Sequence, residues 1–314
     1  MEEHQADKPS QLEKPAQLPA AESSLTTGNK WTVLVLVLLS FFCADTVLAV
    51  IILDLNGGPE DFLTFLFATL LGVCIGQLNL ISTWAAIGPG KIVWRLPWTL
   101  LLAVLTWYAI VLGCRIAEKD YPIENAYAVG VVLLAGILVG QLPLWIAGKF
   151  FGWQLLGWDR SGLVNQSEST RYGLKHILIG MVMLSLAMAP ARAVLPAGQP
   201  EVINLNGESL AFVVALAISN LIICLPCIWG AFASSKKQGS FLVIWPAYCA
   251  VITLIEFGGL VMVLGPPGDS ALFVGLVFYC MNISQCLTVY LTLLIFKGLG
   301  CRLTRVERGI IWLD

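Results

Sequence analysis

Two carboxylates interrupt long apolar stretches of this sequence, and their type and placement suit chemistry inside a membrane. Asp45 and Glu256 each lie about eight residues from the end of an apolar stretch. A charged side chain at such a depth costs about 2.5 to 3.5 kcal/mol, so it usually pairs, protonates or faces water. Arg192 is the basic residue expected at the same level. We expect either a packing ion pair with Arg192 or two neutral hydrogen-bonded acids. The alternative is that Asp45 and Glu256 are the proton- or cation-binding groups of a carrier.

Four carboxamides form a second constellation, because each follows a small-x-x-x-small pattern. The copies are Gly72, Gly76 and Gln77; Gly136, Gly140 and Gln141; Ala215, Ser219 and Asn220; and Cys280, Ser284 and Gln285. Small residues four apart let two helices approach closely in lipid. The amide lies about 100° further round the helix and borders that contact.

The four amides are expected to form one polar layer, which has two interpretations. In the first, each amide hydrogen-bonds across a helix pair and contributes about 1 kcal/mol or less. In the second, the amides converge on a central cavity and line a path for a solute or for water.

The composition predicts a chain that lives in a lipid bilayer. Hydrophobic residues make up 58% of the 314 residues, charged residues only 12%, and the mean hydropathy is +0.82, beyond the range of soluble domains. Each apolar stretch is long enough for a helix that crosses the bilayer, and none alternates as the strands of a barrel would. The predicted spans are 31–53, 62–88, 94–114, 126–148, 174–195, 209–233, 241–264 and 271–296.

Charge predicts how these spans are oriented. With a cytoplasmic N-terminus, the inner segments hold fifteen Lys and Arg residues and the outer segments hold three, which puts both termini inside.

The net charge of −2 comes without a basic stripe, so nucleic acid is excluded as a partner. The bilayer and a further membrane protein are the partners that remain.

The chain also carries signs of a tandem duplication. Lys149-x-x-Gly152-x-Gln154-Leu155 matches Lys297-x-x-Gly300-x-Arg302-Leu303. We expect an all-α protein whose two four-helix halves are parallel, because four helices per half is an even number. The predicted organisation is a disordered cytoplasmic tail over 1–30, repeats over 31–153 and 174–297, a cytoplasmic linker over 154–173, and an interfacial tail over 298–314, read as a short helix on the inner leaflet.

Motifs for catalysis, metal binding and cofactor binding are mostly missing. Cys224-Leu225-Pro226-Cys227 has redox spacing, but it lies in a span, where a proline kink between buried thiols is the favoured interpretation. The chain has two histidines and no G-x-x-x-x-G-K-[ST] motif, so no metal centre and no nucleotide site are expected. An enzyme is the least favoured class, and no cofactor is predicted.

Two short segments carry a resemblance. Arg171 to Ala189, RYGLKHILIGMVMLSLAMA, and Gly298 to Arg305, GLGCRLTR, resemble segments of a family of uncharacterised bacterial multi-spanning membrane proteins. The resemblance implies the bacterial inner membrane and no activity.

Two functions therefore stay open. One is a small-solute or ion carrier with an intramembrane polar site. The other is a non-catalytic membrane scaffold or accessory subunit. A water-filled cavity that reaches Asp45, Glu256 and the amides would favour the carrier, and a closed apolar bundle with a lipid-facing groove would favour the scaffold.

Overall fold

Helices dominate the computed structural model, which describes residues 27–54, 61–89, 92–118, 122–156, 222–264, 270–307 and 310–312. The long apolar runs form helices because in lipid each backbone N–H and C=O must find its partner within the segment. The helices are α1 (Thr27–Asp54), α2 (Asp61–Ile87), α3 (Ile92–Ala117), α4 (Ile123–Phe151), α7 (Ser235–Leu264) and α8 (Ala271–Gly298), with a shorter helical segment at Ile222–Phe232.

Five of these helices are long and apolar enough to cross a membrane, namely α1, α2, α3, α7 and α8. They contain the predicted spans at 31–53, 94–114, 241–264 and 271–296, and α2 ends one residue before the predicted span 62–88 does. The range 126–148 falls within α4, which has 29 residues. The predicted span 174–195 lies outside the described residues, as do residues 209–221 of the predicted span 209–233.

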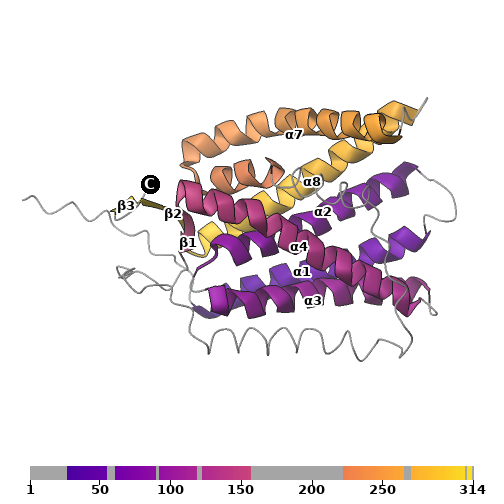
Figure 1. Cartoon of the computed structure of the whole chain (residues 1–314), viewed down its shortest axis with the longest axis horizontal. Helices are drawn as coiled ribbons and strands as arrows, with labels where there is room; N and C mark the ends of the chain where they lie inside the picture. Colours follow the sequence, from indigo (N-terminus) through magenta and orange to yellow (C-terminus); the bar gives the residue numbers. More distant parts are fainter. Residues whose placement is uncertain are drawn as a thin grey trace, which may run out of the picture.

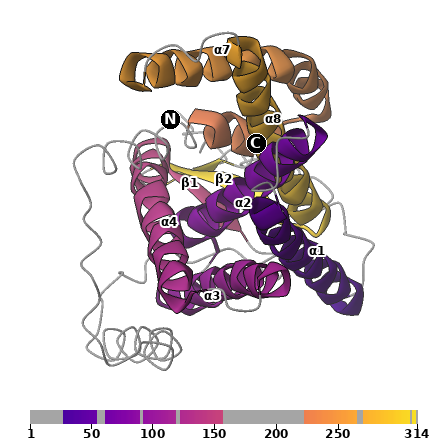
Figure 2. The ribbon, with the colours of Figure 1, turned by 90° about the vertical axis from the view of Figure 1, so that its right-hand side faces the viewer.

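The helix α2 occupies the centre of the described bundle. It packs against α8 most extensively, and also against α4, α1 and α3. Figures 1 and 2 show α1 and α3 on one side of the bundle and α7 on the other, with α2, α4 and α8 between them. Residues on α2 can therefore meet partners from most of the other helices.

The contact between α2 and α8 depends on two glycines. A Cβ atom at Gly72 would clash with both the Met281 carbonyl oxygen and the Ser284 hydroxyl. A Cβ atom at Gly76 would lie 2.9 Å from the Thr288 Cβ and 3.0 Å from the Gln285 carbonyl oxygen. Only glycine lets the two backbones come this close.

The other copies of the small-residue pattern behave differently. No described atom lies within 4 Å of a Cβ built at Gly136, whereas one at Gly140 would lie 3.1 Å from the Ser82 hydroxyl of α2. Cys280 and Ser284 lie on α8 beside the contact with α2, and the Ser284 hydroxyl donates to the Cys280 carbonyl within its own helix, at 2.7 Å. Ala215 and Ser219 lie outside the described residues.

Three short strands correct the all-α expectation. β1 (Trp153–Leu156), β2 (Arg302–Glu307) and β3 (Ile310–Trp312) form an antiparallel sheet in the order β1-β2-β3. The sheet lies where α4 and α8 end (Figure 1), at what we call the strand end of the bundle. The prediction of a short helix in the tail was therefore wrong, and the predicted linker begins with strand residues 154–156. β1 and β2 form strands because they pair with each other. The sequence of either segment alone does not reveal this partner.

A glycine at each helix end turns the chain into its strand. Gly152 has φ 67° after α4 and Gly300 has φ 99° after α8, a left-handed conformation that costs glycine little. After α8 the Cys301 N–H donates to the Phe296 carbonyl at 2.9 Å, as in a Schellman cap. The two helices that share the Lys-x-x-Gly match are thus each followed by a left-handed glycine three residues after the lysine.

The pairing of β1 with β2 is reciprocal. Leu155 lies opposite Leu303, its counterpart in the sequence match. Gln154 lies opposite Thr304, and Leu156 lies opposite Arg302, the counterpart of Gln154. A twofold axis between two antiparallel strands produces this register. If one residue lies opposite a second, the axis also places the counterpart of the first opposite the counterpart of the second.

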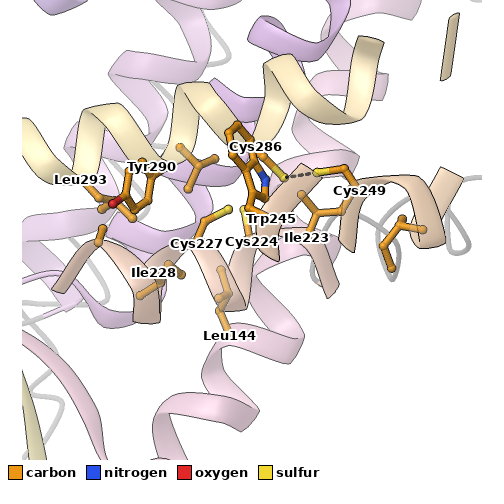
Figure 3. Packing of buried hydrophobic residues seen from close by; sticks show 13 residues of the cluster. Leu144, Ile223, Cys224, Cys227, Ile228, Trp245, Cys249, Cys286, Tyr290 and Leu293 are labelled. Atoms are coloured by element: carbon orange, nitrogen blue, oxygen red, sulfur yellow. Dashed lines mark hydrogen bonds between the residues drawn. The ribbon is translucent and has the colours of Figure 1, made fainter. Parts of the chain in front are cut away.

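The largest buried cluster joins the helical segment Ile222–Phe232 to α4, α7 and α8. It includes Leu144 of α4 and Leu293 of α8, as well as Trp245 of α7, and Figure 3 shows these side chains around the segment. The Lys297 ammonium donates to the carbonyls of Ala231 at 3.2 Å and Ala233 at 2.8 Å. A cation in this position stabilises the carboxyl end of a helix, so α8 fixes where the segment ends.

We predict that Gly72→Ala destabilises the protein by about 1 to 3 kcal/mol, because the added methyl overpacks the α2–α8 contact. Gly136→Ala, at the equivalent position of the second copy, is the matched control and leaves stability unchanged. Thermal unfolding of the two variants in the same detergent measures the difference. Equal midpoints would contradict the packing described for Gly72.

Candidate intramembrane site

Asp45 and Gln77 form a buried hydrogen-bonded pair between α1 and α2. The Gln77 Nε2 donates to the Asp45 Oδ1 at 2.9 Å, and the two side chains are 3% and 1% exposed, respectively. Gln77 follows Gly76, so when the glycine faces α8 the amide points about 100° away, toward α1. The amide supplies the hydrogen bond that a carboxylate in this apolar setting requires.

Glu256 and Asn282 form a second acid–amide pair between α7 and α8. The Asn282 Nδ2 donates to the Glu256 Oε2 at 2.6 Å and lies 3.0 Å from the Thr253 hydroxyl oxygen. Asn282 is fully buried. The two carboxylates, predicted as a possible couple, are thus each engaged by an amide of the next helix along the chain.

Three of the four amides that were predicted to form one layer lie in the described part of the chain, and all three are buried. Gln77 lies on α2, Gln141 on α4 and Gln285 on α8. Counted from the left-handed glycines, Gln141 lies eleven residues before Gly152 and Gln285 fifteen before Gly300. Four residues correspond to about 6 Å along a helix, so these amides are one turn apart. Asn220 and Arg192 lie outside the described residues.

A cavity of about 420 Å³ reaches the first acid–amide pair. Its walls come from α1, α2, α3 and α8, and its lining includes both Asp45 and Gln77. Cys301, which directly precedes β2, also lines it, so the cavity extends toward the strand end. Trp31 and Trp98, each more than half exposed, mark this end. Along α1, Trp31 and Asp45 are about 21 Å apart at 1.5 Å per residue.

The lining of this cavity is apolar and rich in aromatic rings. Asp45 is the only Asp, Glu, Lys, Arg or His among its described lining residues. Six aromatic side chains contribute, namely Trp31, Phe41, Phe42, Trp84, Trp98 and Phe296. A cavity of this size and composition is typical of a small-molecule site, which combines apolar walls with a few placed polar groups.

Sequence reasoning missed several parts of this arrangement. It did not single out Asn282, although an asparagine within an apolar stretch is a signal of its own. It also missed Gly113 on α3, where a Cβ atom would lie 2.2 Å from the Thr46 carbonyl oxygen of α1. The cavity itself was not predicted, because it depends on how α1, α2, α3 and α8 pack together.

Four cysteines meet in the largest core cluster, and two of them are the redox-spaced pair. Cys224 and Cys227 are each 1% exposed. The Cys249 thiol donates to the Cys286 sulfur at 3.6 Å (Figure 3). Within the described ranges no group of three or more His, Cys, Asp or Glu side chains could hold a metal ion. These thiols pack as small apolar groups.

No family model, curated protein or solved structure matches this chain.

We predict an energetic coupling of about 1 to 2 kcal/mol between Asp45 and Gln77, because removing the amide takes from a buried carboxyl group one of its hydrogen-bond donors. A double-mutant cycle of Asp45→Ala and Gln77→Ala, followed by reversible unfolding in micelles, measures it. Asp45→Ala combined with Asn282→Ala is the control cycle and should be additive, because Asn282 engages Glu256. Additivity in the first cycle as well would argue against the pair.

Proposed function

We propose that this chain is an eight-span protein of the bacterial inner membrane, with both termini cytoplasmic and two parallel four-helix repeats. The reciprocal β1–β2 register and the matching ends of α4 and α8 support the duplication. A twofold axis at the sheet would exchange α4 with α8 and α2 with the helical segment Ile222–Phe232. Both α2 and this segment pack against α4 and α8, in keeping with that exchange.

We further propose that the protein is a small-solute carrier whose site is the cavity between α1, α2, α3 and α8. The observation that carries this proposal is the buried Asp45–Gln77 pair within the lining of a 420 Å³ cavity. An ionisable group at such a depth is costly, and residues of this kind typically mark a binding or transfer site. A purely structural role for the pair would not need a cavity beside it.

The chemistry of the lining narrows what such a carrier would take. The cavity contacts one acid–amide pair, whereas Glu256, Gln141 and Gln285 are not among its lining residues. Its remaining walls are nearly all apolar, which favours a solute with substantial apolar surface over a fully hydrated one. Asp45 would bind the polar part of that solute, and Gln77 would hold the carboxylate in position.

We predict that the full chain, reconstituted in proteoliposomes, accumulates at least one class of amphipathic solute saturably. The assay offers radiolabelled hydrophobic cations, anions and neutral compounds under an imposed pH gradient. Asp45→Asn should lower this uptake at least tenfold, because the charge is lost while the asparagine oxygen can still accept from Gln77.

Gly136→Ala is the control and should transport as the wild type does. Uptake no greater than in protein-free vesicles would overturn the carrier proposal and favour a scaffold. Unchanged uptake by a folded Asp45→Asn protein would also overturn it.

A further inference from the structure

We infer that the cavity binds a hydrophobic organic cation, with Asp45 as its counter-ion. This inference rests on the proposed function, because it names the substrate class of the same cavity. The first observation is charge: a single carboxylate and no described basic side chain lines the cavity. An anion placed there would meet like charge, and a neutral compound would leave the carboxylate without a counter-ion.

The hydrogen bonds of Asp45 supply no counter-charge. The Gln77 amide is bonded to Oδ1 and the Cys74 thiol is also hydrogen-bonded to Asp45, and neither neutral donor neutralises a carboxylate. A cation close to a carboxylate is attracted strongly where water is scarce, because the local dielectric is low. Charged groups within membranes commonly act as counter-ions of a bound ligand in this way.

The aromatic walls supply the second, independent observation. Six aromatic side chains from α1, α2, α3 and α8 line the cavity. Among them, Phe42 lies on α1 with Asp45, and Trp84 lies on α2 with Gln77. The faces of aromatic rings attract cations, and tryptophan does so most strongly. A carboxylate combined with aromatic walls is the chemistry that recognises a bulky ammonium or phosphonium ion. Aliphatic walls alone would suit any apolar solute.

Two probes of nearly the same size and shape but opposite charge test this inference. Full-length protein in nanodiscs is titrated with radiolabelled tetraphenylphosphonium or tetraphenylborate, and binding to empty nanodiscs is subtracted. The wild type should bind the phosphonium saturably and show no saturable binding of the borate. Asp45→Asn should weaken phosphonium binding at least tenfold, and Leu102→Trp should do the same by filling the cavity.

The control is Glu256→Gln, which removes an intramembrane carboxylate that does not line the cavity, and it should bind as the wild type does. Equal binding of the two probes by the wild type, or an equal loss in Glu256→Gln and Asp45→Asn, would overturn the inference. The binding and transport assays distinguish the two proposals. Phosphonium that binds through Asp45 but is not transported would overturn the carrier proposal. Uptake of only neutral or anionic solutes would overturn the inference that the ligand is a cation.

Discussion

The close approach of α2 to α8 is the constraint on which the rest of the described structure depends. With Gly72 and Gly76 against the α8 backbone, the rotation of α2 about its axis is fixed. The next residue, Gln77, then faces α1 and meets Asp45. A bulkier residue at either glycine would separate the helices and turn the amide, so helix packing and the chemistry of the site depend on the same contact.

The proposed duplication and the candidate site differ in symmetry. The ends of α4 and α8 and the register of β1 with β2 fit a twofold relation. The carboxylates do not, because Asp45 lies on the first helix of one proposed half and Glu256 on the third helix of the other. The cavity therefore belongs to one side of the molecule. A duplicated scaffold in which one half has acquired a polar site would have this form.

The sequence predicted the helices well, because apolar runs of sufficient length leave the backbone few alternatives in lipid. It also singled out Asp45 and Gln77, since polar residues in such runs are conspicuous. It did not pair them with each other, because the pairing depends on the rotation of α2 against α8. The strands β1 and β2 were missed for a related reason: each is specified by a partner about 150 residues away. The cavity likewise depends on packing between four helices.

Chemical labelling at position 45 tests most directly whether the carboxylate lies in an accessible cavity. In full-length protein carrying Asp45→Cys, modification by N-ethylmaleimide is followed by mass spectrometry of the peptide that contains this position. Our account predicts that the new thiol reacts, and that adding Leu102→Trp slows its reaction at least tenfold. A thiol that fails to react in the folded protein, or one that reacts equally fast in both variants, would contradict it.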